Sequence, residues 1–288
     1  MMDRFGIGWR PELAAGILSQ LDRLDIVEVT ADDYFDAPKA KRRALKTLGC
    51  QCPVVLHGVT LGLASSVAVE EKRLEQTARL VEEIQPEFWS EHLAFVRGGG
   101  IEIGHLAAPP RTEMTIEGAA KNLTTARKIV GAITIVENVA TLIDPPGSTL
   151  TEASWTRDIL TAANCGLLLD LHNLYANSVN FAFDPHDFID RIPQKQIRAI
   201  HLAGGRWIKA KSNGESRLLD DHLHDVPEVV YDLLEYVGEK TFHPLTVILE
   251  RDGRYPPMEV LLSQLDGARE ALRRGRTKQQ TRAPSEAA

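Results

Sequence analysis

Short apolar runs alternate with longer amphipathic stretches along almost the whole chain, and this alternation restricts the fold more than any other feature of the sequence. Each apolar run has the length and the composition of a buried strand. Eight runs qualify: Phe5–Trp9, Asp25–Thr30, Pro53–His57, Phe88–His92, Thr134–Asn138, Gly166–Asp170, Arg198–Leu202 and Leu245–Glu250. Runs such as Val54–Leu56 are apolar without a break, which is typical of parallel strands covered on both faces.

The stretches between these runs repeat apolar residues at helical spacing, as in Leu74, Ala78, Val81 and Ile84. Helices are predicted for residues 11–22, 39–48, 66–85, 117–130, 154–163, 186–191, 226–237 and 258–273. Eight β–α units in about 270 residues predict an α/β fold, a single-domain TIM (β/α)8 barrel of the xylose isomerase-like type, with a doubly wound open sheet as the alternative. We expect the barrel to span residues 1–274 and the polar tail 275–288 to be disordered.

The overall charge and the absence of long apolar segments narrow the range of partners. Asp and Glu number 40 against 33 Lys and Arg, so the formal charge of −7 predicts no general attraction to nucleic acid or anionic membranes. The N-terminal segment lacks the apolar part of a signal peptide, and no window approaches the roughly 18 apolar residues of a spanning helix. We therefore expect a cytoplasmic protein without nucleic acid or membrane partners, whose three cysteines are reduced.

Acidic and histidine residues stand at the carboxyl ends of the predicted strands. Seven of them share this position: Glu28, His57, His92, Glu137, Asp170, His201 and Glu250. The loop after the seventh strand adds Asp220 and His222. In a TIM barrel the strand ends meet at one mouth, so side chains spread over about 200 positions are predicted to form a single site.

Taken singly, each of these residues is adequately explained as a core histidine or a solvated carboxylate. The set is not, because burial and like charge both oppose the ionisation of several carboxylates in one mouth. Lys and Arg are scarce at these strand ends, which indicates metal ions as the counter-charge. The eight candidate ligands are His57, His92, Glu137, Asp170, His201, Asp220, His222 and Glu250. They exceed the ligands of one catalytic ion and predict two or three ions, with iron, zinc and manganese all compatible.

Some candidates have more specific roles. Glu137 and Glu250 are the best candidates for bridging two ions, and Asp220 is preferred over Asp221 because it shares the side of His222 in an extended segment. By the same alternation His172 projects with Asp170, as a weaker ninth ligand or a hydrogen-bonding residue of the mouth. The other histidines lie away from strand ends and are predicted to be structural or surface residues: His105, His186, His224 and His243.

Together these motifs resemble those of a known family. The matching segments are Leu56–Gly58, Ser90–Leu93, Val136–Val139, Asp170–Tyr175, His201–Gly204, Asp220–His222 and Leu249–Asp252. In this order they are similar to the successive motifs of the multinuclear non-heme iron-dependent oxidative enzymes, the family to which the methanobactin-maturation oxidase belongs. The resemblance runs from about residue 5 to residue 265. Each tripeptide alone is a weak signal, but the ordered set is specific.

The resemblance implies an oxidoreductase with a TIM barrel that holds two or three irons in mixed Fe(II)/Fe(III) valence. Such an enzyme uses dioxygen to modify a side chain, often cysteine, in a ribosomally made precursor peptide, commonly with a separate partner protein that recruits the peptide. The eight residues above are then the iron ligands. Where some members have a histidine that binds a third metal ion, this chain has Asn173, so His172 or Asn173 would have to bind that ion. Asn138 and Asp252 are candidates for orienting ligands, and Glu28 is assigned no ligand role.

Two other functions fit the same ligand order. One is metal-assisted hydrolysis of phosphodiesters, as in the three-zinc apurinic endonucleases, or the related chemistry of divalent-metal sugar isomerases. Endonuclease activity requires a basic DNA-binding face, which the acidic composition disfavours. The other is a non-catalytic metal-binding or docking protein, which an open barrel mouth rich in ligands disfavours. Iron-dependent oxidation of a peptide therefore remains the main hypothesis.

Overall fold

The computed structural model describes residues 2–132, 134–209 and 214–282. Eight parallel strands close into a barrel in chain order, apart from two hairpins inserted outside it. The barrel strands are β1 (Arg4–Gly8), β2 (Ile26–Thr30), β3 (Val54–Gly58), β4 (Trp89–His92), β7 (Thr134–Glu137), β8 (Gly166–Asp170), β9 (Ile197–Leu202) and β12 (Thr246–Leu249). The predicted TIM barrel is confirmed, and all eight predicted strands are present within one or two residues of their expected bounds.

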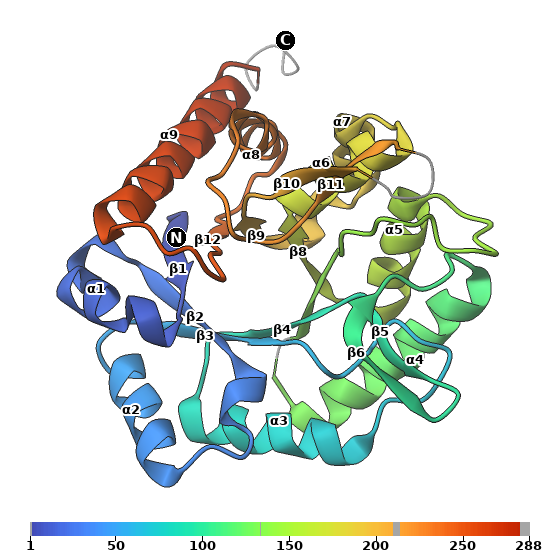
Figure 1. Ribbon diagram of the computed structural model, residues 1–288, viewed down its shortest axis with the longest axis horizontal. Helices are drawn as coiled ribbons and strands as arrows, with labels where there is room; N and C mark the ends of the chain where they lie inside the picture. Colours follow the sequence, from blue (N-terminus) through green and yellow to red (C-terminus); the bar gives the residue numbers. More distant parts are fainter. Residues whose placement is uncertain (1, 133, 210–213, 283–288) are drawn as a thin grey trace.

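Helices form a ring around the strands (Figure 1). They are α1 (Ala14–Ser19), α2 (Lys39–Gly49), α3 (Glu71–Ile84), α4 (Glu113–Val130), α5 (Glu152–Ala163), α6 (Leu171–Phe181), α7 (Pro185–Arg191), α8 (Glu228–Lys240) and α9 (Met258–Arg282). The main core lies between this ring and the outward faces of the strands. No helix in the described part of the chain is long and apolar enough to cross a membrane.

A second, smaller core fills the inside of the barrel. Its members are Ile26, Val55, Phe88, Ile135, Leu168, Ala199 and Ile248. Because side chains alternate between the faces of a strand, the residue two positions further along projects to the same inner side. For six of these seven residues that following residue is acidic or histidine: Glu28, His57, Glu137, Asp170, His201 and Glu250. One alternating pattern along the strands therefore determines both the apolar plug, which is formed by these seven residues, and the polar mouth above it.

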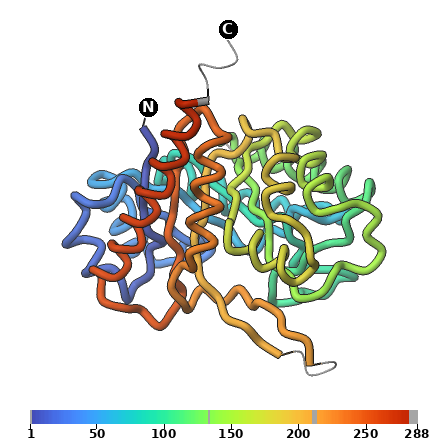
Figure 2. The backbone as a smooth tube through the Cα atoms, turned by 90° about the horizontal axis from the view of Figure 1, so that it is seen from above, coloured from blue at the N-terminus to red at the C-terminus, as the bar shows by residue number. Residues whose placement is uncertain are grey.

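Two antiparallel hairpins lie outside the barrel, in segments where no strand was predicted. β5 (Phe95–Gly98) pairs with β6 (Ile101–Ala107), and β10 (Arg206–Lys209) pairs with β11 (Ser216–Leu219). The hairpin β10–β11 projects from the barrel at the end opposite to the C-terminal part of α9 (Figure 2). Both hairpins follow barrel strands, so they flank the mouth at the carboxyl ends of the strands.

Helix α6 begins directly after β8, where no helix was predicted. It contains Asn residues, which disfavour helix interiors. The Asp170 side chain caps it by accepting the backbone N–H of Asn173 at 2.6 Å. This corrects one expectation about His172: since it lies in the first turn of a helix, it does not follow the strand alternation that would place it beside Asp170. Its side chain contacts Asp220 instead, with Nδ1 2.6 Å from Oδ1.

The expectation of a disordered tail from Gly275 is wrong for the residues described, because α9 continues to Arg282. Polar residues in this last part make long-range contacts. Arg276 Nη2 is 2.8 Å from Asp3 Oδ1, and Lys278 Nζ is 2.5 Å from Glu235 Oε1. Gly275 packs so closely that an added Cβ would lie 2.1 Å from the Glu235 carbonyl oxygen. Ion pairs with α8 and the N-terminus thus extend a helix that its composition alone does not favour. Residues 283–288 lie outside the described part.

Candidate metal centre

The carboxylate of Glu137 lies at the middle of the mouth and faces three histidines. Its Oε2 atom is 3.3 Å from His57 Nε2 and 3.3 Å from His92 Nε2. Its Oε1 atom is 3.2 Å from His201 Nδ1. Glu137 is 1% exposed, so these groups meet in a nearly dry environment. His57, His92 and Glu137 form one group whose ligand atoms all lie close enough together to hold a metal ion.

A second such group shares Glu137 and consists of Glu137, Asp170, His201 and Glu250, all of them buried. His201 Nδ1 is 3.1 Å from Glu250 Oε2 as well as facing Glu137. One carboxylate common to two compact groups has the arrangement of a ligand that bridges two ions. Among the described residues, these two groups are the ones compact enough to hold an ion.

Asp220 and His222 lie beside the second group but outside both compact groups. His222 Nε2 is 2.8 Å from Asp220 Oδ2, and His222 Nδ1 is 3.5 Å from Glu250 Oε2. His222 has a positive φ of 52°, a conformation that is uncommon for residues other than glycine. The structure therefore brings all eight predicted ligands into one mouth, six of them into the two compact groups and two beside Glu250.

Several buried polar atoms in the mouth lack a hydrogen-bond partner, among them Asp170 Oδ2, His172 Nε2 and Asn173 Oδ1. Such atoms are costly unless a cation or a donor satisfies them. Burial raises the pKa of Asp170 well above its usual range, and the nearby carboxylates of Asp220 and Glu137 add to the effect. Burial also opposes ionisation of Glu250, but His201 and His222 outweigh it and lower its pKa. The donor set and the unpartnered atoms fit metal ions at this site.

The nitrogen of each imidazole that points away from the two groups is held by a fixed partner. His57 Nδ1 is 2.8 Å from Ser90 Oγ, and His92 Nδ1 is 3.1 Å from the Gly58 carbonyl oxygen. His201 Nε2 is 2.9 Å from Glu28 Oε2. Contacts of this kind fix the tautomer and the ring orientation of a metal-binding histidine. In each of these three histidines the other ring nitrogen therefore faces Glu137 in a fixed orientation.

Glu28 is the residue whose role the sequence analysis did not assign. It is 2% exposed and contacts His201 on the side away from Glu137. The signal was present in the sequence, because Glu28 ends the second strand as the ligand candidates end theirs. What the sequence could not show is that a histidine from β9 stands between Glu28 and the other carboxylates.

Asn138 and Asp252, which were predicted to orient ligands, and Asn173 hold different parts of the mouth. Asn138 exchanges hydrogen bonds with the backbone of Asp170, through Nδ2 at 3.0 Å and Oδ1 at 2.9 Å. Asn173 donates to the Asn138 carbonyl oxygen at 3.0 Å and leaves its buried Oδ1 without a partner. Asp252 lies 3.1 Å from His222 Nδ1 and also accepts from Arg10, a cation at the mouth.

A cavity of about 510 Å³ opens directly onto the centre. His92, Glu137, Asn173, Asp220 and His222 form its polar part, while the loop after β7 and the two hairpins contribute apolar residues. His105 of β6 also lines it. His105 is exposed, as expected of a surface residue, and the hairpin β5–β6 places it at the edge of the cavity. His186 and His243 do not line this cavity, and His243 Nε2 contacts the Ile197 carbonyl oxygen at 2.5 Å.

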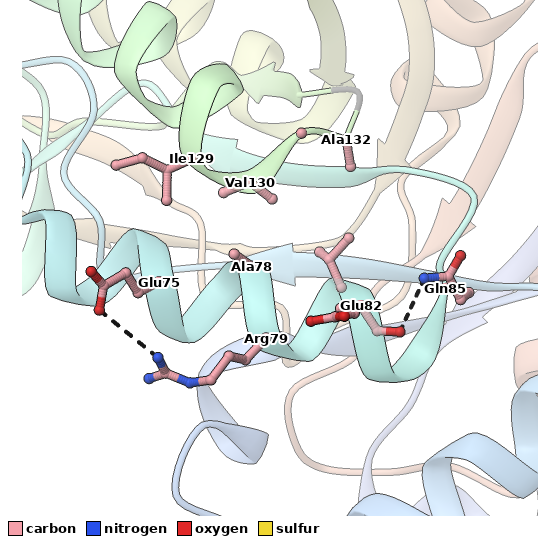
Figure 3. A pocket seen from close by; sticks show the side chains of 10 residues that line it. Glu75, Ala78, Arg79, Glu82, Gln85, Ile129, Val130 and Ala132 are labelled. Carbon is pink, nitrogen blue, oxygen red and sulfur yellow. Dashed lines mark hydrogen bonds and ion pairs between the residues drawn. The ribbon is translucent and has the colours of Figure 1, made fainter.

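Another hollow lies between the C-terminal halves of α3 and α4 (Figure 3). Its polar contacts are an ion pair of 3.9 Å between Arg79 and Glu75 and a hydrogen bond from Gln85 to the Glu82 carbonyl oxygen. The described residues that line it include no histidine. It reaches Ala132, just before β7, and so lies toward the amino ends of the strands. This hollow has no connection with the centre.

A closed (β/α)8 barrel with buried histidine and carboxylate groups at its carboxyl end defines a class of protein, the xylose isomerase-like TIM barrels with a candidate metal site. The chain belongs to the family of RiPP precursor modification enzymes described as MbnB/TglH/ChrH, whose model matches residues 4–273. The resemblance inferred from the motifs is thereby confirmed. Membership in this family implies a precursor peptide as substrate.

Curated relatives are similar over nearly the whole chain. A UPF0276 protein of Streptomyces avermitilis is 34% identical over 95% of this chain, which spans only 56% of that longer protein. A UPF0276 protein of Bordetella bronchiseptica is 30% identical, with 94% of this chain and 93% of the relative covered.

Solved structures resemble the fold at low sequence identity. L-ribulose 3-epimerase has a TM-score of 0.59 at 16% identity and covers 100% of this chain and 99% of its own. A xylose isomerase-like TIM barrel protein from Mycobacterium smegmatis in complex with magnesium has a TM-score of 0.59 at 12% identity, with 97% and 100% covered. At these identities the likeness shows the barrel and nothing about the reaction.

Proposed function

We propose that this protein holds two or three irons at the Glu137 centre and uses dioxygen to oxidise a cysteine side chain of a ribosomally made precursor peptide. A separate partner protein that recruits the peptide is part of the proposal. Dioxygen accepts the electrons that the side chain loses. The observation that carries the proposal is the sharing of Glu137 between two buried groups that open onto one cavity.

The residues of the mouth divide into two sets around the shared carboxylate, and a further pair extends the second set. His57, His92 and Glu137 would hold one ion, and Glu137, Asp170, His201 and Glu250 a second. Asp220 and His222, with Glu250, are the residues available for a third. Iron bound there supplies one-electron redox chemistry and open positions for a thiolate and for dioxygen.

The protein's own share is to orient these ligands and to control what reaches them. Ser90, Gly58 and Glu28 fix the histidine rings, so that the nitrogen atoms facing Glu137 keep their lone pairs directed into the mouth. The Asn173 Oδ1 atom, buried and unpartnered beside the cavity, is placed to accept a hydrogen bond from a bound substrate. The apolar lining limits the access of bulk water to the bound side chain.

The cavity supports a peptide substrate over a nucleic acid. Among the described residues that line it there is no Lys or Arg. Proteins that bind phosphodiesters rely on such cations for affinity, since the charge of the backbone must be neutralised. An endonuclease would need such cations along the cavity, where the described lining residues instead include Phe95, Leu142, Ile143 and Leu219.

The test is a comparison of reactions with and without air. Protein purified anaerobically is loaded with Fe(II), characterised by metal analysis and Mössbauer spectroscopy, and mixed with a cysteine-bearing precursor peptide and the partner protein encoded near its gene. We expect oxygen consumption and a change in the mass of the peptide that is absent from the zinc-loaded protein and from the Cys→Ser peptide. Oxygen-independent cleavage of abasic DNA, or epimerisation of a ketose, by the metal-loaded protein without peptide oxidation would refute the proposal.

A further inference from the structure

Several residues that line the cavity above the centre have large apolar side chains, and Leu142 and Ile143 among them are exposed. Five of these lining residues are together called the apolar wall: Phe95, Leu106, Leu142, Ile143 and Leu219. Ile143 is 70% exposed and Leu142 is 39% exposed, although both belong to a loop beside buried polar groups. Large apolar side chains grouped at the rim of a polar centre are typical of a surface that a ligand covers.

The wall is held in place by buried asparagines of α6. Asn177 donates to the Val139 carbonyl oxygen at 2.9 Å and accepts the Thr141 N–H at 2.9 Å. One turn further on, Asn180 accepts the Leu218 N–H at 2.8 Å and donates to its carbonyl oxygen at 3.0 Å. Asn177 is 0% and Asn180 is 4% exposed. Both the loop after β7 and strand β11 are therefore tied to one helix.

The far end of the same loop is tied to a buried arginine. The N–H groups of Thr149 and Leu150 donate to the Arg111 carbonyl oxygen at 3.0 and 3.1 Å, and Arg111 Nη1 is 3.0 Å from Asp144 Oδ1. A loop fixed at both ends does not fold back to bury Leu142 and Ile143. It presents them in a fixed position, which lowers the entropic cost of covering them with a ligand.

The occupant of the cavity is constrained by what lies beneath the wall. His92, Glu137, Asp220 and His222 belong to the candidate centre and line the same space as the wall. A molecule that fills the cavity therefore brings one group to the centre while a neighbouring part covers the wall. With no Lys or Arg among the described lining residues, the part on the wall is neither phosphate nor carboxylate.

We propose that the apolar wall selects precursor peptides in which a large apolar residue flanks the residue that is modified. This inference rests on the proposed function in taking a peptide as the substrate, but it concerns recognition rather than oxidation. Burial of one leucine-sized side chain gives a preference of at least about tenfold in affinity over a charged residue at the same position.

The experiment measures binding without turnover. Fluorescein-labelled ten-residue peptides carry one cysteine in a Gly-Ser background, flanked on both sides by Leu in one peptide and by Asp in the other. Fluorescence anisotropy against the anaerobic Fe(II)-loaded protein gives both dissociation constants. The variants are Leu142→Glu and Ile143→Glu, and the matched control is Leu18→Glu, since Leu18 is 50% exposed on α1, away from the cavity. Ile143 is so exposed that its substitution leaves the fold intact.

We expect the Leu-flanked peptide to bind the unmodified protein and the Leu18→Glu variant at least about tenfold more tightly than the Asp-flanked peptide. In Ile143→Glu and Leu142→Glu this preference should fall below about threefold. Equal binding of the two peptides, absence of measurable binding of the Leu-flanked peptide, or a preference that survives in both variants would overturn the inference. Failure of the proposed oxidation appears separately, as intact selective binding without an oxygen-dependent change of peptide mass.

Discussion

Replacing Glu137 by Gln tests the organisation of the whole centre, because both compact groups depend on this residue. The substitution keeps the size of the side chain but removes the charge and one acceptor oxygen. Loss of a contact that only orients a ligand costs about 10- to 100-fold in metal affinity. A carboxylate common to two groups should cost more than about 100-fold, and at least one ion should be absent from the purified variant.

The same loss of metal affinity lowers the stability of the metal-loaded protein. A metal that binds only the folded protein stabilises it in proportion to the logarithm of its affinity, so a 100-fold weaker affinity removes about 2.7 kcal/mol. For a chain of this size that corresponds to a decrease of about 5–10 °C in the Tm of the metal-loaded protein. The assays are differential scanning calorimetry with and without Fe(II) under anaerobic conditions, together with metal analysis.

The matched control is Glu91→Gln. Glu91 is also fully buried at the mouth, but its carboxylate accepts the N–H groups of Leu61 and His92 and belongs to neither compact group. It should lower the Tm of the metal-free and metal-loaded forms by similar amounts, and it should retain its metal. Full metal content and an unchanged metal-dependent increase of Tm in Glu137→Gln would refute the bridging role.

Three further predictions concern the surroundings of the centre. In Glu28→Ala the His201 ring loses the acceptor for its Nε2 atom, so the Fe(II) affinity measured by chelator competition should fall about 10- to 100-fold. Glu28→Gln keeps an acceptor oxygen and should lose less affinity. Equal Fe(II) affinities of Glu28→Ala and the unmodified protein would contradict the orienting role. Burial lowers the pKa of His92, but Glu137 and Glu91 outweigh it and raise the pKa to about 9. Protonated His92 cannot bind metal, so the affinity of the protein for Fe(II) should increase from pH 7 to about 9. Over the same range the Tm of the metal-free protein should fall, because the positive charge of His92 that stabilises the folded state is lost. An Fe(II) affinity and a metal-free Tm that do not change with pH would contradict this prediction. His186→Ala should retain metal and activity, because His186 is exposed and paired with Asp184. His201→Ala should lose both, because His201 belongs to a compact group. Metal analysis and oxygen uptake are the measurements.

The strand-borne part of the centre was predictable from sequence for one physical reason. A closed parallel barrel forces every second residue of a strand inward, so an apolar residue followed two positions later by an acid or histidine marks both the plug and the mouth. Val55 with His57 and Leu168 with Asp170 follow this rule. Glu28 follows it too, but the sequence could not tell a residue that contacts a ligand from a ligand itself.

The parts that sequence reasoning did not predict depend on contacts between distant segments. The asparagines of α6 disfavour a helix locally, but each gains buried hydrogen bonds to other loops, as Asn180 does to Leu218. The hairpin strands are short and largely exposed, so they lack the continuous apolar runs that mark the barrel strands. The contact between His172 Nδ1 and Asp220 Oδ1 joins the start of α6 to a loop 48 residues later. No pattern within either segment encodes it.

This difference between strand and loop has a consequence for the number of ions. The six residues on strand ends form compact groups because the barrel fixes their spacing. Asp220 and His222 come from the loop after β11 and belong to neither compact group, although His222 Nδ1 lies 3.5 Å from Glu250 Oε2. His172 Nδ1 lies 2.6 Å from Asp220 Oδ1, so one oxygen of that carboxylate already has a partner. We therefore expect the two strand-borne positions to bind metal more tightly than the loop-borne one. Stepwise removal of iron by a chelator, followed by Mössbauer spectroscopy, should release a third ion first where one is present, and an equal rate of release for all ions would show that the loop is as rigid as the barrel.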